Sequence, residues 1–136
     1  MRASPHRQEV ETLRRRAHDF LNEAHEALAR ERYDLSCFFS EQAVQLYVKS
    51  VLLERLGDYP RLHHLRALLS ESAKGASSKE LEEFIRDNRV GLSNLEDAYL
   101  IARYTTKTYL KEDAEDMARL AETAISAVKR AFGVDR

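Results

Sequence analysis

The chain has 136 residues, of which 43% are hydrophobic and 33% are charged, as is usual for one soluble domain. The 22 basic and 23 acidic residues nearly cancel, which excludes the strongly basic surface of a typical duplex-DNA-binding protein. The single cysteine, Cys37, excludes a disulfide framework and a cysteine-based zinc site. Four glycines and two prolines are too few for a β-sandwich or a Rossmann fold, so the composition favours a helical bundle.

The first residues and the apolar stretches of the sequence indicate the cellular location. Residues 1–7 are charged and carry no apolar signal segment, so we expect a cytoplasmic protein. Unbroken apolar stretches are only a few residues long, so we expect no contact with a membrane. No composition shift or linker divides the sequence, and we expect a single domain over 1–136 with its core over about 8–132.

Apolar residues recur at helical spacing through the first half of the chain. They predict an amphipathic helix over about 8–30, with Arg14 among the charged residues of its exposed face. The next helix is apolar on nearly all sides, and Asp34 is its expected N-cap. The expected end of this central helix is Gly57, because Pro60 follows three residues later.

The second half of the chain contains turn signals as well as helical patterns. Two pairs, Ser77 with Glu80 and Ser93 with Glu96, have the spacing of capping boxes and predict two helix starts. Residues 74–78 read as a flexible loop, and the β-branched residues within 105–108 predict a break. The helices predicted in this half cover about 65–72, 78–88, 94–104 and 111–132. The expected fold is therefore all-α, an antiparallel up-and-down bundle of four long helices plus a short helix.

Several kinds of catalytic or cofactor site find no support in the sequence. The glycines are too scattered to form a phosphate-binding loop. His63 and His64 are adjacent and point in different directions, so they make poor chelators, and we expect neither a metal nor a cofactor. Cys37 falls in the apolar central helix and reads as a small core residue rather than a nucleophile.

The stretch 94–106 is the most suggestive of a ligand site. Tyr99 and Arg103 are four residues apart and share a helix face, with Glu96 one turn earlier. An arginine beside tyrosines can hold a phosphate through two hydrogen bonds while a ring stacks on a base. The same three residues can instead form a surface network that only stabilises the bundle, and the sequence leaves both readings open.

Other polar residues complete the candidate set. Lys49 interrupts the apolar central helix, and either extends to solvent or offers its charge to an anion. Further polar groups follow Arg103 at the same end of the bundle. The expected ligand-binding residues are Arg103, Tyr104, Tyr99, Glu96, Lys49, Lys107 and Tyr109.

Three segments in a fixed order make the sequence resemble a HEPN domain: Arg32–Leu53, Gly57–Leu69 and Leu95–Tyr104. The resemblance covers about 10–132 and implies an up-and-down helical bundle. Small stand-alone members of the family pair with a minimal nucleotidyltransferase in toxin–antitoxin systems and form homodimers. The resemblance therefore implies a homodimeric protein that binds a nucleotide or an RNA phosphate and works with such a partner.

Many HEPN proteins are metal-independent ribonucleases with an arginine followed by four to six residues and then a histidine. None of the five histidines has an arginine at that distance, and the positions after Arg103 are held by Thr108, Tyr109 and Leu110. A threonine hydroxyl does not titrate near neutrality and cannot replace an imidazole as acid or base. Whether the protein is an enzyme stays open. The alternatives are a divergent ribonuclease, in which His64 supplies the imidazole to Arg103, and a non-catalytic interaction module.

Overall fold

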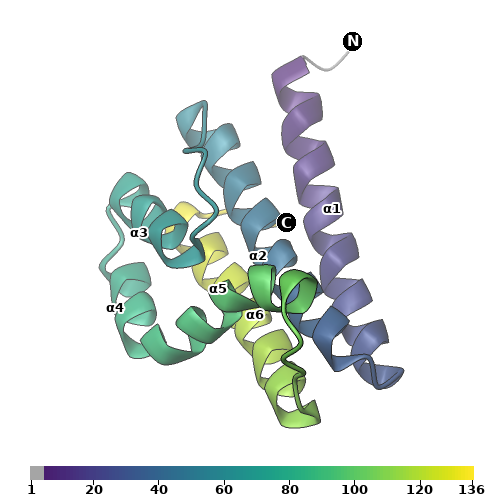
Figure 1. The fold of residues 1–136 in the computed structure, drawn as a ribbon. Coiled ribbons are helices and arrows are strands. Elements are labelled where there is room, and N and C mark those ends of the chain that lie inside the picture. Colours follow the sequence, from purple (N-terminus) through teal and green to yellow (C-terminus); the bar gives the residue numbers. More distant parts are fainter. Residues whose placement is uncertain (1–4) are drawn as a thin grey trace.

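The computed structural model describes residues 5–136, which form six α-helices and no strand (Figure 1). Residues 1–4, on which part of the signal-segment prediction rests, lie outside this range. The helices are α1 (Pro5–Ala29), α2 (Tyr33–Leu56), α3 (Leu65–Ala76), α4 (Lys79–Asp87), α5 (Arg89–Tyr104) and α6 (Lys111–Phe132). The all-α prediction is confirmed. None of these helices is long and apolar enough to cross a membrane.

Helix α2 is the centre of the bundle, as its apolar sequence predicts. It packs along α1 and also contacts α3, α5 and α6. Residues on several of its faces, among them Cys37, Val44 and Val48, are fully buried in the core. Burial raises the pKa of the Cys37 thiol to about 12, so this cysteine is an inert core residue at neutral pH.

The C-terminal ends of α2 and α6 follow local glycine signals. Gly57 has a φ of 87°, and its backbone N–H donates to the carbonyl of Leu53. Gly133 has a φ of 65° and closes α6 in the same way. Helix α6 matches its predicted bounds, and residues 105–110 form the predicted break before it.

The predicted N-cap of α2 is wrong. The helix begins one residue earlier, at Tyr33, and its N-cap position is held by Arg32 without a side-chain hydrogen bond. The carboxylate of Asp34 instead accepts a 2.7 Å hydrogen bond from the backbone N–H of Tyr109. Asp34 therefore makes a long-range contact to Tyr109 instead of the local N-cap that the sequence predicts.

The connection between α3 and α4 is shorter than the predicted loop over 74–78. Helix α3 continues to Ala76, and Ser77 ends it in the left-handed conformation with a φ of 51°. The N-cap of α4 is Ser78, whose hydroxyl accepts a 3.0 Å hydrogen bond from the backbone N–H of Leu81. The capping box predicted at Ser77 is therefore wrong by one residue.

The helix start predicted at Ser93 is also wrong. Helix α5 begins at Arg89 and runs without interruption, so Ser93 lies inside it. The carboxylate of Glu96 accepts a 3.0 Å hydrogen bond from the backbone N–H of Arg66, in the first turn of α3. It also accepts a 3.1 Å hydrogen bond from the Arg66 guanidinium. Glu96 thus satisfies an amide at the start of another helix rather than its own.

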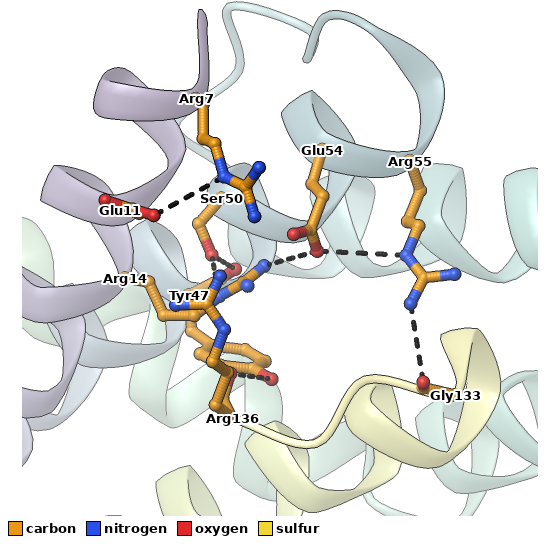
Figure 2. Close-up of polar contacts among 9 residues, drawn as sticks. All are labelled: Arg7, Glu11, Arg14, Tyr47, Ser50, Glu54, Arg55, Gly133 and Arg136. Carbon is orange, nitrogen blue, oxygen red and sulfur yellow. Dashed lines mark hydrogen bonds and ion pairs between the residues drawn. The ribbon is translucent and has the colours of Figure 1, made fainter. Parts of the chain in front are cut away.

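Arg14 is the fourth departure from the sequence pattern. It was expected on the exposed face of α1, yet it is only 3% exposed. Its Nε donates to Ser50 Oγ at 3.2 Å and its Nη2 to Glu54 Oε1 at 3.1 Å (Figure 2). The polar side chains that α2 presents to α1 make this burial tolerable for a charged group.

Candidate functional site

The guanidinium of Arg103, near the end of α5, lies over three aromatic rings. Its Cζ atom is 4.8 Å from the ring centroid of Tyr104, 5.2 Å from that of Tyr99 and 5.9 Å from that of Phe38. Phe38 comes from α2 and the two tyrosines from α5. We call these four residues the Arg103 cluster. Because ring faces attract the face of the guanidinium, its N–H groups stay free to donate at the edge.

The charge of Arg103 is not neutralised by a neighbouring acid. Its side chain is exposed, and no carboxylate oxygen of residues 5–136 lies within 4.0 Å of its guanidinium nitrogens. Glu96, the acid expected to join it, is directed to Arg66 and lies 3.8 Å from Nδ1 of His64. The expected network of Glu96, Tyr99 and Arg103 is therefore reduced to the contact between Tyr99 and Arg103. This leaves an exposed cation beside aromatic rings, and such a cation can bind an anion through charge-assisted hydrogen bonds.

A row of stacked rings leads away from Arg103. The Tyr99 ring stacks on His63, with centroids 5.7 Å apart and planes inclined by 12°. The Tyr99 ring also stacks on Phe38, with centroids 6.4 Å apart and planes inclined by 28°. Tyr104 is different, because 67% of its surface is exposed. The site therefore offers one accessible aromatic ring beside an arginine, and a second tyrosine held by its neighbours.

A buried carboxylate lies near this site, and sequence reasoning missed it. Glu41 on α2 is 0% exposed and accepts hydrogen bonds from Gln42 at 2.8 Å and Gln45 at 3.0 Å. Burial raises the pKa of Glu41 to about 7, against the opposing effects of these two hydrogen bonds and of Lys49. Gln45 also donates to the backbone carbonyl of His63 at 2.7 Å, which ties α2 to the chain beneath the ring row. The available signal was a carboxylate in the middle of the predicted central helix, far from both of its ends.

The two candidate lysines contact other rings. The Nζ of Lys49 lies 5.7 Å from the ring centroid of Tyr59, and burial lowers the pKa of this half-buried lysine. The Nζ of Lys107 lies 5.6 Å from the ring centroid of Tyr109. Tyr109 itself is buried, and its hydroxyl finds no hydrogen-bond partner in the described part of the chain. Burial raises the pKa of Tyr109 to about 12. These residues belong to separate surroundings from the rings of the Arg103 cluster.

The histidines of the connection between α2 and α3 also divide. His64 is exposed and faces Glu96, whereas His63 is the imidazole that stacks on Tyr99. His63, rather than the expected His64, is therefore the imidazole that shares a ring contact with Arg103, through Tyr99. Within the described part of the chain, no group of three or more histidine, cysteine, aspartate or glutamate side chains is arranged to hold a metal ion.

Comparisons with known proteins identify the fold and the family. A crystal structure of TT1696 from Thermus thermophilus superposes with a TM-score of 0.75 at 21% identity, covering 90% of this chain and 97% of that one. The structure of ST0689, an archaeal HEPN homologue, gives a TM-score of 0.68 at 24% identity, with the same coverage. Curated proteins give no match. The family model for the HEPN domain matches residues 10–131, and the chain therefore belongs to the HEPN domain family.

Proposed function

We propose that this HEPN-domain protein binds a nucleotide, or a phosphate group of an RNA, at the Arg103 cluster. The observation that carries the proposal is the exposed guanidinium over three rings, with no carboxylate of residues 5–136 within 4.0 Å. Two N–H groups of Arg103 donate to phosphate oxygens, and the exposed ring of Tyr104 stacks on a base.

Titration of nucleotides and of a short single-stranded RNA tests this proposal. Arg103→Ala removes charge-assisted hydrogen bonds worth about 1.5–3 kcal/mol, so affinity should fall by roughly 10- to 100-fold. Arg86→Ala is the matched control, because Arg86 is an exposed arginine of α4 that pairs with Asp87. Equal affinity of the wild-type and Arg103→Ala proteins for every ligand would remove Arg103 from the site.

The family membership supports a proposal about partners as well. We infer that the protein is a cytoplasmic homodimer, built from one domain, that pairs with a minimal nucleotidyltransferase in a toxin–antitoxin system. Sedimentation of the purified chain tests the dimer, and co-expression with a nucleotidyltransferase encoded beside it tests the pair. If the pair forms with undiminished affinity after Arg103→Ala and no nucleotide binds, the chain is an interaction module instead.

A second candidate function is RNA cleavage without a metal. It is favoured by the stacking of His63 on Tyr99 and the placement of His64 beside Glu96, which bring two imidazoles to the α2–α3 connection. An imidazole can act as acid or base at neutral pH, and Arg103 would stabilise the phosphate charge. Labelled RNA should then be cut in the presence of EDTA. Loss of cutting in His63→Ala or His64→Ala identifies the imidazole, and no cutting of any RNA rejects this function.

A further inference from the structure

A second group of arginines lies away from the Arg103 cluster, between α1, α2 and the C-terminal residues. At its centre is Arg14, which is only 3% exposed and uses Nε and Nη2 to bind Ser50 and Glu54. Its Nη1 is also buried, but it has no hydrogen-bond partner among residues 5–136. A buried charged donor without a partner costs about 1–3 kcal/mol or more, so an unsatisfied guanidinium nitrogen at this position requires an explanation.

The charges around Arg14 do not balance. Glu54 is bound by Arg14 at 3.1 Å and lies 3.7 Å from Nε of Arg55. Partial burial would raise the pKa of Glu54, but the hydrogen bond from Arg14 and the charges of Arg14, Arg55 and Arg136 outweigh it and lower the pKa. The Glu54 carboxylate thus pairs with two guanidinium groups, those of Arg14 and Arg55, while the charge of Arg136 acts on it from beyond ion-pair distance. Figure 2 shows these side chains converging from α1, α2 and the C-terminal residues.

Tyr47 and His18, which lie beside Arg14, are each close to more than one cation. The ring of Tyr47 lies between two cations, with Arg14 Cζ 5.7 Å and Lys129 Nζ 5.8 Å from its centroid. Burial lowers the pKa of His18, and the charges of Lys129 and Arg14 lower it further, against the opposing charge of Asp19. Arg7 reaches the same region from the start of α1, where its Nε lies 3.6 Å from Glu11 (Figure 2).

We propose that these cations form a second anion site, which takes a phosphate group with two negative charges. We call it the Arg14 cluster and define it as Arg14, Glu54, Arg55, Lys129 and Arg136. A phosphate dianion would neutralise the excess charge, and its several oxygens would accept hydrogen bonds from the planar edges of guanidinium groups. Arg55 and Arg136 are exposed, so an anion from solvent meets these two guanidinium groups first. It would reach the buried Nη1 of Arg14 only after the side chains that cover this atom move aside.

Titration calorimetry and thermal unfolding with inorganic phosphate test the site at constant ionic strength. The protein carrying Arg103→Ala is the background, so that failure of the Arg103 cluster does not affect the result. We expect phosphate to bind and to raise the unfolding temperature, whereas acetate and chloride do so much less. Arg55→Gln and Arg136→Gln should each weaken phosphate binding at least fivefold, and Arg86→Gln should leave it unchanged. These two exposed arginines are used because substitution of the buried Arg14 endangers folding.

A nucleoside 5′-monophosphate, compared with inorganic phosphate, identifies the source of the phosphate group. Tighter binding of the monophosphate indicates a terminal phosphate of a nucleotide or nucleic acid, and equal binding indicates free phosphate. An internal phosphodiester carries one charge and should bind more weakly than either. The proposal is overturned if none of these ligands binds. It is also overturned if acetate matches phosphate, or if Arg55→Gln and Arg136→Gln bind phosphate as the parent does; Arg14 would then serve only to join α1 to α2.

Discussion

Replacing the buried carboxylate of Glu41 by an amide, Glu41→Gln, should change how stability depends on pH. Glu41 is fully buried and accepts hydrogen bonds from Gln42 and Gln45. Lys49 favours its charged form, and Glu96 and burial disfavour it, burial being the largest effect. The amide has nearly the same shape, keeps an oxygen for Gln45 and has no proton to lose. The substitution therefore isolates the cost of ionising one group inside the bundle.

The size and sign of the effect follow from proton linkage. Burial raises the pKa of Glu41 from 4.5 to about 7, so the folded protein binds a proton that the unfolded chain has released. The contribution of Glu41 to the free energy of unfolding is therefore highest below pH 4.5 and is lost as the pH rises through about 7. A shift of this size corresponds to about 3 kcal/mol, at roughly 1.4 kcal/mol for each pH unit between the two pKa values.

Urea unfolding of the wild-type and Glu41→Gln proteins from pH 4.5 to 8.5 measures this loss. Both proteins carry His18, whose lowered pKa gives an opposite slope, so only the difference between the two curves is interpreted. Glu41→Gln should gain up to about 3 kcal/mol on the wild type across this range. Glu83→Gln, at an exposed position of α4, is the control and should follow the wild type. If the curves of Glu41→Gln and the wild type stay parallel, Glu41 is not desolvated as described.

Three further predictions concern residues at or near helix ends. Asp34→Ala removes the acceptor of the Tyr109 N–H and should cost about 1–3 kcal/mol in urea unfolding, with faster hydrogen exchange at Tyr109. Asp34→Asn keeps an acceptor and should cost less; equal losses would mean that charge alone matters. Ser78→Ala should cost about 1 kcal/mol, because it removes the N-cap of α4. Ser77→Gly should stabilise the protein, since Ser77 has a φ of 51°, which glycine adopts at lower cost. If Ser77→Gly destabilises the protein and Ser78→Ala does not, Ser77 rather than Ser78 caps α4.

The parts of the fold that sequence predicts well depend on local interactions. The end of α2 follows from Gly57, whose left-handed conformation closes the helix on Leu53. The bounds of α6 follow from a regular apolar stripe between a β-branched break and Gly133. The burial of α2 follows from apolar residues on all its faces. Each of these signals lies within a few residues of its consequence.

The errors arise where a second segment decides the conformation. Gly75 reads as a turn residue, but it lies inside α3, where a Cβ atom would come within 2.7 Å of Leu56 Cδ1. The glycine gives room for close packing against the end of α2 rather than a bend. Arg14 reads as an exposed charge, but Ser50 and Glu54 on α2 supply its partners. A pattern along one helix contains no information about such neighbours.

In the candidate site, too, the sequence predicts the local contacts and not the long-range ones. The spacing of Tyr99 and Arg103 predicts that they share a face, and the structure places them in contact. Phe38 and His63 come from other segments, and nothing near them in the sequence assigns them to these rings. Arg103 is free for a ligand because the Glu96 carboxylate, on the same helix, is held by Arg66. Long-range contacts therefore decide both what surrounds the arginine and what leaves it unpaired.

This division predicts that Glu96 supports the fold and does not bind the ligand. Burial would raise the pKa of Glu96, but hydrogen bonds and charge from Arg66, with a smaller effect of His64, lower it. The stability it contributes is therefore present above pH 4.5 and is lost as the pH falls through the lowered pKa. Glu96→Ala should cost about 1–3 kcal/mol in urea unfolding at pH 7, because the first turn of α3 loses an acceptor. Nucleotide affinity should stay within about twofold of wild type, whereas a loss of affinity like that of Arg103→Ala, with stability unchanged, would place Glu96 in the binding site.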